Sequence, residues 1–176
     1  MTYWTPEETR KLLEVAYREN QNHHLFILTA ITFGLRVSEV CAITGTQIED
    51  GQLSVQRLKR SNRTLQPVMV TTDPITDCSP LLERAKLNPG LLFPWSRRWA
   101  DKFVKFYGEK AGIHKSKRHM HAAKHTTAML LWGASQSLGE IQNFLGHKSA
   151  SSSLQYLREI DMQKGIASRN KAMSQI

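Results

Sequence analysis

The sequence predicts a mainly helical single domain with a small antiparallel β-sheet, an α+β fold. Apolar residues recur at helical spacing along both halves of the chain, and capping-box sequences open two of these segments. Between the halves lie two short segments of strand-like composition joined by a polar stretch that suits a hairpin. With 176 residues and 40% hydrophobic content, the chain is long enough to bury one sizeable core.

Three helices are predicted in the first fifty residues. The first begins at residues 5–8 (Thr-Pro-Glu-Glu), where a threonine cap, a first-turn proline and a capping-box glutamate combine. The second spans about residues 23–33, and Gly34 is placed to end it. The third begins near Arg36 and ends near Gly45.

The predicted sheet is a short hairpin. Residues 52–57 and 65–70 are expected to form its strands, with residues 59–63 at the tip. Pro67 cannot donate a backbone hydrogen bond, so the second strand is expected to be an edge or irregular one.

The second half of the chain is predicted to be helical after a turn at residues 88–90 (Asn-Pro-Gly). Ser137 and Glu140 supply a second capping box. Helices are expected at about residues 95–111, 118–132, 137–145, 150–157 and 160–173.

The charge of the chain indicates a polyanionic partner. The net charge is +9 and the isoelectric point is about 9.8, which favours nucleic acid over an anionic membrane surface. Basic residues dominate two segments, 57–63 and 97–125, whereas acidic residues gather in the first fifty. A basic protein without such a partner is the alternative that charge alone leaves open.

Two classes of location are not expected. The chain has no run of about 18 apolar residues, as a membrane span requires, and it does not open with a basic region followed by an apolar one. Its cysteines, Cys41 and Cys78, stand far apart and in no metal-binding spacing. A reducing, cytoplasmic setting is therefore expected.

Two pairs of polar residues have spacings that would let the members of each pair act together. Arg36 follows a helix-ending glycine, and Glu39, one turn later, can pair with it and orient it. His121 and Lys124 lie three residues apart, so one face of a helix would present both. Taken singly, each has a plainer interpretation as a surface residue or a weak surface ion pair.

His147 and Tyr156 form a further candidate pair. Their spacing of nine residues would put them half a turn out of phase on a continuous helix. Both can reach one site only if the chain breaks between them, and Gly146 and the serine-rich residues 148–153 suit such a break.

The order Gly-Leu-Arg36-Val-Ser-Glu39, His121-x-x-Lys124, Leu-Gly-His147 and Tyr156 resembles the catalytic domain of tyrosine recombinases, the phage-integrase family. The resemblance covers nearly the whole chain and implies metal-free DNA cleavage and rejoining. One position departs from the family, which usually has arginine where Lys124 stands. An ammonium can neutralise a phosphate oxygen but cannot make the two-pronged contact of a guanidinium.

The resemblance implies a nucleophile and an acid. Tyr156 would attack a scissile phosphate, form a 3′-phosphotyrosyl link and free a 5′-hydroxyl. Lys59, near the hairpin tip, would protonate that leaving oxygen, although Arg57, Arg60 and Arg63 compete for the assignment.

The resemblance also implies the groups that bind the phosphate. Arg36, Lys124 and His147 would contact its oxygens, and His121 would orient or deprotonate around it. The basic residues expected to contact DNA are Arg57, Arg60, Arg63, Lys115, Lys117 and Arg118. No cofactor or metal is expected, because His121 and His125 are followed by no third ligand at a convincing spacing.

The resemblance further implies double-stranded DNA as partner and a homo-tetramer on DNA, with the state in solution left open. Residues 1–176 are expected to be a single catalytic domain without the family's N-terminal DNA-clamping domain. Two other functions compete with site-specific recombination. One is a recombinase-fold DNA-binding regulator of little or no activity, which the lysine at position 124 favours. The other is a type IB topoisomerase, which shares the phosphotyrosyl chemistry.

Overall fold

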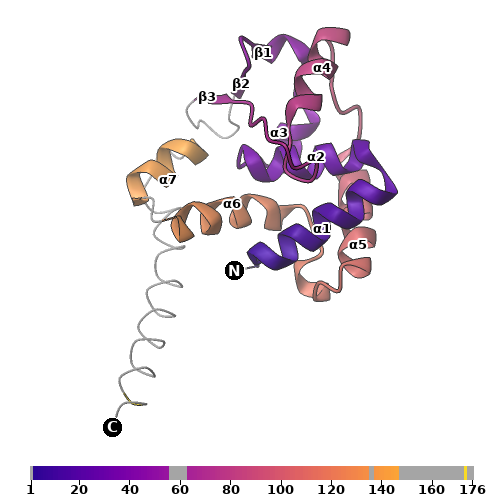
Figure 1. Ribbon diagram of the computed structural model, residues 1–176, viewed down its shortest axis with the longest axis vertical. Helices are drawn as coiled ribbons and strands as arrows, with labels where there is room; N and C mark the ends of the chain where they lie inside the picture. The colour runs from indigo at the N-terminus through magenta and orange to yellow at the C-terminus, as the bar shows by residue number, and fades with distance from the viewer. Residues whose placement is uncertain (1, 56–62, 135–136, 147–172, 174–176) are drawn as a thin grey trace.

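A mainly helical fold with one small antiparallel sheet forms from the residues that the computed structural model describes, which are 2–55, 63–134, 137–146 and 173 (Figure 1). The helices are α1 (Pro6–Glu19), α2 (Gln21–Thr32), α3 (Val37–Cys41), α4 (Ser79–Leu87), α5 (Arg97–Lys110), α6 (His121–Gly133) and α7 (Leu138–Leu145), with 3₁₀ helices η1 (Gly45–Gln47) and η2 (Lys115–Lys117). The strands β1 (Ile48–Glu49), β2 (Gln52–Val55) and β3 (Thr64–Pro67) pair in the order β1-β2-β3. The predicted fold class is confirmed.

The first two helices begin where their caps place them. The capping box of α1 is present, since the Glu8 amide donates to Thr5 Oγ1 at 3.1 Å and the Thr5 amide donates to Glu8 Oε2 at 2.8 Å. Helix α2 begins two residues earlier than predicted, because the Asn20 side chain accepts from the amides of Asn22 and His23. It ends as predicted, with Gly34 at a φ of +60°.

The core surrounds α2, which contacts α1, α3 and α6. Most of its residues are buried, including Phe26 and Ile27 at 0% exposure. The largest fully buried side chains elsewhere are Trp4, Phe33 and Phe93. Burial of aromatic and aliphatic side chains around one central helix is the main stabilising contribution in this fold.

The sheet is smaller at one end than predicted. Strand β3 pairs with β2 from Thr64 opposite Val55 to Pro67 opposite Gln52, so Pro67 lies on an edge strand as expected. The predicted extension to residue 70 is wrong. The Val68 amide still donates to the Gly51 carbonyl at 2.8 Å, but the Met69 carbonyl then accepts from the Cys78 amide and not from a strand partner. Of the predicted strand 52–57, residues 56–57 lie outside the described residues.

Several helix boundaries also differ from the prediction. Helix α3 ends at Cys41 and not near Gly45, where the 3₁₀ helix η1 begins instead. Helix α5 is shorter than the predicted residues 95–111 at both ends. Its start is set by Ser96, which caps it. Helix α6 begins three residues later than predicted, after η2.

Strand β1, helix α4 and the two 3₁₀ helices were not predicted, and two predicted helices cannot be assessed. Strand β1 is only two residues long. Helix α4 buries just Leu81, so it carries almost no apolar periodicity. Helix α7 has its predicted capping box, but residues 150–157 and 160–172 lie outside the described residues. Within the described part of the chain, no helix is long and apolar enough to cross a bilayer.

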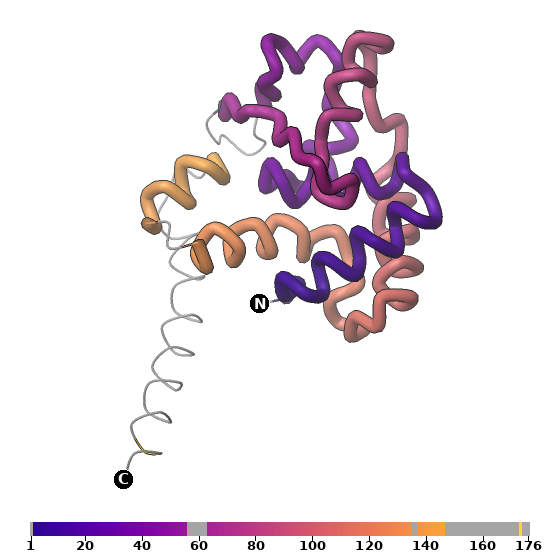
Figure 2. The backbone as a smooth tube through the Cα atoms, in the orientation of Figure 1, coloured from indigo at the N-terminus to yellow at the C-terminus, as the bar shows by residue number. Residues whose placement is uncertain are grey.

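Helix α7 lies between the C-terminal half of α6 and strand β3 (Figures 1 and 2). The buried Gln66 of β3 donates to the Phe144 carbonyl at 3.0 Å. Gly34 also approaches α6 and α7. A Cβ at this position would lie 2.5 Å from Leu145 Cδ2 and 3.3 Å from Thr127 Cγ2. The segment that carries Arg36, the helix that carries Lys124 and the end of α7 at Leu145 therefore meet at this glycine.

Gly34→Ala should destabilise the protein by about 2–4 kcal/mol, because it combines left-handed backbone strain with a clash against a fully buried leucine. Urea unfolding would measure this. The matched control is Gly112→Ala, since Gly112 has a φ of +70° but nothing within 4 Å of the added Cβ. Equal losses for the two variants would contradict the packing argument.

Candidate active site

Arg36 is held by a buried carboxylate. Its backbone amide donates to Glu39 Oε2 at 2.8 Å, and its guanidinium Nη1 donates to Glu39 Oε1 at 3.0 Å. The Glu39 side chain is 0% exposed and that of Arg36 is 27% exposed. The predicted orienting pair is therefore present, and its buried carboxylate distinguishes it from a surface ion pair. The guanidinium has its remaining donors to offer to an anion.

Lys124 connects α6 to the end of α7. It is 4% exposed, and its Nζ donates to the carbonyl of Leu145, the last residue of α7, at 3.3 Å. Carbonyls in the last turn of a helix lack intrahelical partners and carry partial negative charge, so a buried ammonium is stabilised there. Gly146, at a φ of +67°, caps the helix.

His121, the first residue of α6, lies in the positive field of these two cations. His121 is exposed as a residue, but the partial burial of its ring is the main cause that lowers its pKa, and the charges of His119, Arg36 and Lys124 lower it further. The electrostatic influence of Arg36 and Lys124 on one ring indicates that the fold brings the three predicted residues together. A neutral imidazole near pH 7 can accept a proton.

His125 is a second neutral imidazole in the same group. Its ring lies edge-on to that of His121, with 4.6 Å between centroids. Burial is the main reason that its pKa falls to about 4, and the neighbouring His121 adds to the effect. Despite this grouping of rings, no set of three His, Cys, Asp or Glu side chains among the described residues is arranged to hold a metal ion.

The site therefore combines an oriented guanidinium, a buried ammonium and a neutral imidazole. Two cations and a proton acceptor are what a phosphodiester needs when its oxygens gain negative charge in a transition state.

Comparisons with known proteins agree with this chemistry. The model of the Phage integrase family matches residues 2–163. The chain belongs to the phage integrase family.

Two relatives illustrate the match to this family. The tyrosine recombinase XerH of Campylobacter jejuni is 29% identical over 170 residues, which cover 88% of this chain and 47% of the relative. The tyrosine recombinase XerA of Pyrococcus furiosus is 34% identical over 166 residues, which cover 88% of this chain and 56% of the relative. The chain thus spans about half the length of these curated relatives.

Solved structures share the fold at low sequence identity. A XerA recombinase crystal structure matches with a TM-score of 0.71 and 21% identity, over 93% of this chain and 64% of that one. The catalytic domain of bacteriophage HP1 integrase matches with a TM-score of 0.68 and 16% identity, over 90% and 88%. The expected integrase catalytic-domain fold is confirmed.

Several predicted integrase-site residues lie outside the described residues. These are Lys59, His147, Tyr156, Arg57 and Arg60. Of these, only His147 has described residues next to it in the sequence, and two residues before it the Leu145 carbonyl accepts from Lys124.

The predicted DNA-contacting residues that are described differ in their surroundings. Arg63 and Lys115 are exposed, and Arg63 Nε donates to Ser54 Oγ at 2.5 Å across the hairpin. Lys117 and Arg118 are half-buried and engaged within the protein. Lys117 pairs with Glu8 at 2.8 Å, and Arg118 Nε donates to the Ile113 carbonyl at 2.6 Å.

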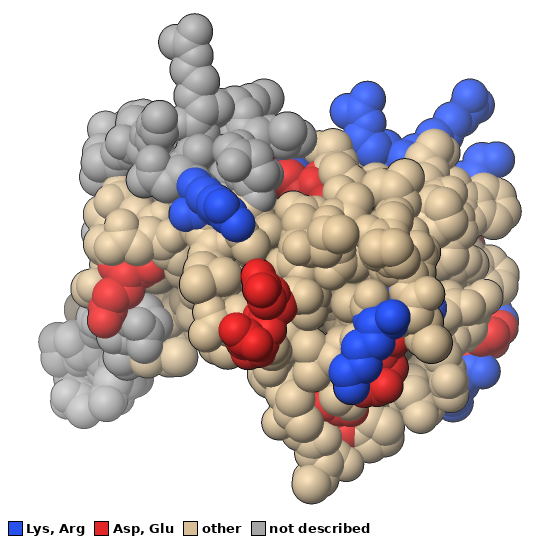
Figure 3. Space-filling model, turned by 90° about the horizontal axis from the view of Figure 1, so that it is seen from above, with Lys and Arg blue, Asp and Glu red and all other residues tan. Residues whose placement is uncertain are grey.

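A basic hollow beside the site was not singled out from the sequence. It has a volume of about 600 Å³. The residues that line it are Val37, Arg97, Arg98, Asp101, Lys102 and Lys105. Apart from Val37, the lining residues come from one face of α5. The helical spacing of the basic residues in the sequence would therefore have revealed the hollow. Figure 3 shows lysine and arginine side chains projecting from one edge of the molecule, while further basic groups and acidic groups lie side by side on the rest of that face.

The depressed pKa of His125 predicts acid lability. In the unfolded chain His125 takes up a proton below an ordinary histidine pKa of about 6.5, whereas in the folded protein it does so only near pH 4. The free energy of unfolding therefore falls as the pH drops from 6.5 to 4. The contribution is at most about 3.5 kcal/mol, at about 1.4 kcal/mol per pKa unit. His125→Gln should reduce the loss of stability between pH 6.5 and 4, measured by urea unfolding.

The matched control for this experiment is His114→Gln. His114 is exposed, and its ring Nδ1 bonds to the Ser116 hydroxyl at 2.8 Å, two residues along the chain. The control should keep the wild-type pH dependence. An unchanged slope in His125→Gln would contradict the assignment to His125.

Proposed function

We propose that the chain is the catalytic part of a site-specific tyrosine recombinase that cleaves and rejoins double-stranded DNA. The observation that carries this proposal is the convergence of Arg36, Lys124 and His121, with Glu39 buried behind the arginine. The match of the phage integrase family over residues 2–163 supports it, because that range includes Lys59, His147 and Tyr156.

In the proposed reaction the Tyr156 oxygen attacks the scissile phosphorus as its proton leaves toward a base around the phosphate, for which His121 is the described candidate. The bond from phosphorus to the 5′ oxygen breaks, and Lys59 protonates that oxygen. The 3′-phosphotyrosyl link conserves the bond energy, so a hydroxyl from another strand can reverse the step without ATP. Arg36, Lys124 and His147 would stabilise the charge on the phosphate oxygens.

DNA is the partner that the surface charge suits. The hollow lined by Arg97, Arg98 and Lys105 provides cations for a phosphate backbone beside the site. Arg63 and Lys115 are exposed enough to add contacts, and Arg57 and Arg60 belong to the same proposal.

The assembly and location are also part of the proposal. One similar structure is XerH bound to difH, with a TM-score of 0.72, and another is a lambda integrase tetramer bound to a Holliday junction, with a TM-score of 0.71. A homo-tetramer on DNA in the cytoplasm is proposed by analogy with these integrases.

Tyr156→Phe should abolish covalent attachment to DNA and leave DNA binding near wild type, because only the nucleophilic oxygen is removed. SDS-resistant adducts formed in EDTA on fragments of the source's own DNA, with the attached ends sequenced, would measure this. The matched control is Tyr17→Phe, a half-buried tyrosine of α1. Adducts from Tyr156→Phe would refute the nucleophile.

The wild-type result of the same assay separates the proposal from its competitors. Adducts at a few sites support a recombinase. Adducts scattered along the DNA indicate a topoisomerase. Salt-sensitive binding without adducts indicates a regulator, a function that the engagement of Lys124 with Leu145 would then explain.

Lys124→Met should lower the single-turnover cleavage rate about 10²–10³-fold with DNA affinity nearly unchanged, because a positioned donor is lost from the transition state. Lys102→Met, in the basic hollow, should affect DNA binding and not the cleavage rate. It should reduce the slope of log affinity against log salt by about 0.9 and leave the rate at saturating DNA unchanged. Identical effects of the two substitutions would contradict these separate roles.

A further inference from the structure

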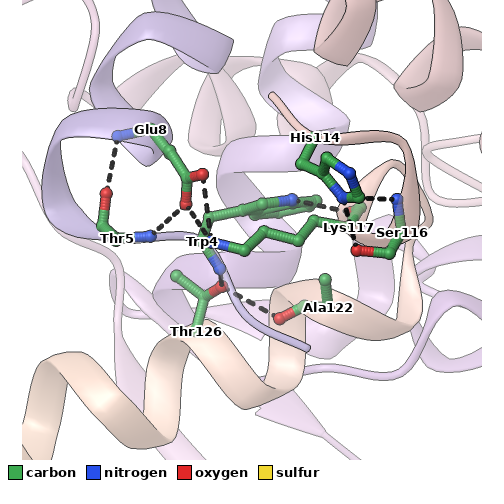
Figure 4. Close-up of polar contacts among 8 residues, drawn as sticks. All are labelled: Trp4, Thr5, Glu8, His114, Ser116, Lys117, Ala122 and Thr126. Carbon is green, nitrogen blue, oxygen red and sulfur yellow. Dashed lines mark hydrogen bonds and ion pairs between the residues drawn. The ribbon is translucent and has the colours of Figure 1, made fainter. Parts of the chain in front are cut away.

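The segment Thr2–Glu8, here called the strap, crosses the start of α6 (Figure 4). Trp4 is 1% exposed and bonds to both sides of that start. Its indole Nε1 donates to the Lys117 carbonyl at 2.9 Å, and its backbone amide donates to Thr126 Oγ1 at 2.9 Å. The strap therefore joins the residues before α6 to the interior of the helix.

Two further contacts hold the same residues. The ammonium of Lys117 donates to both carboxylate oxygens of Glu8, at 3.0 and 2.8 Å. Burial opposes ionisation of Glu8, but the hydrogen bonds from Lys117 and Thr5 outweigh it and lower the pKa of this carboxyl. The hydroxyl of Thr2 bonds to His119 Nε2 at 3.1 Å. Lys117 and His119 lie four and two residues before His121, the first residue of α6.

The start of α6 has no side-chain cap. Met120 makes no side-chain capping bond, and its backbone amide donates to Asp101 Oδ1 of α5 at 2.9 Å. The amides of Ala122 and Ala123 donate to the carbonyls of His119 and Met120, each at 3.1 Å. The first turn of α6 is therefore bonded to the residues just before it, so contacts that hold those residues also hold the turn. His121 lies in this turn.

We propose that the strap is a positioning element for the phosphate-binding end of α6, and that Lys117 is a positioning residue rather than a DNA contact. The inference rests on the proposed function, since the groups it positions are His121 and Lys124. Loosening the strap would let the first turn of α6 shift. A shift of about 1 Å in a catalytic group can cost up to about 10²-fold in rate.

The test compares substitutions that weaken the strap without removing its aromatic anchor. Lys117→Met breaks the ion pair with Glu8, and Lys117→Arg retains it. Thr126→Val removes the acceptor of the Trp4 amide. Controls are Lys11→Met, which breaks the exposed pair with Glu7, and Thr29→Val, whose hydroxyl bonds to Leu25 within α2.

Three readouts are needed: amide hydrogen exchange of residues 119–125, the single-turnover cleavage rate at saturating DNA, and the salt dependence of DNA binding. Lys117→Met and Thr126→Val should raise exchange in that segment and lower the rate about 10- to 100-fold, with the salt slope unchanged. Lys117→Arg should restore both, and the controls should match wild type.

Other results would overturn the inference. Unchanged exchange, or faster exchange with an unchanged rate, would show that the strap does not position the site. A salt slope reduced by about 0.9 in Lys117→Met would identify a phosphate contact instead. If wild type itself forms no adduct, the proposed function fails, whereas the exchange measurement still decides whether the strap holds α6.

Discussion

The close approach of α2, α6 and α7 at Gly34 is the constraint on which the site depends. A Cβ at this position would meet Leu145 and Thr127, so only the residue without a side chain allows the three segments to come together. Arg36 follows this glycine by two residues and Lys124 precedes Thr127 by three. One backbone contact therefore sets the distance between cations that are far apart in the sequence.

Placing cations together requires compensation, and the fold supplies it by different means. Arg36 has the fully buried carboxylate of Glu39 behind it. Lys124 has the carbonyl end of α7. The nearby histidines give up their charge instead, since burial and the neighbouring cations lower the pKa of His121. The site is thus positive where a phosphate would bind and neutral where a proton would be accepted.

Elements that carry their own local signal were predictable from the sequence. The capping boxes at Thr5 and Ser137 identify the starts of α1 and α7, because each is completed within four residues. Helix α4 was missed because it buries only Leu81, and the start of α6 was misplaced because its first turn is held by Asp101 and the strap. Neither of these partners is a sequence neighbour.

For the site, the sequence determined which groups are present and the tertiary structure decided what each one contacts. The order of Arg36, His121, Lys124, His147 and Tyr156 indicated the family, and the Arg36–Glu39 pair followed from a spacing of one turn. From the sequence alone, Lys117 and the basic residues of α5 could not be told apart, because each is simply a positive charge. Only packing across more than a hundred residues joins Lys117 to Glu8 and leaves the α5 cations around an open hollow. The reason is physical: local spacing specifies a helix face, whereas the partner of that face depends on how the whole chain packs.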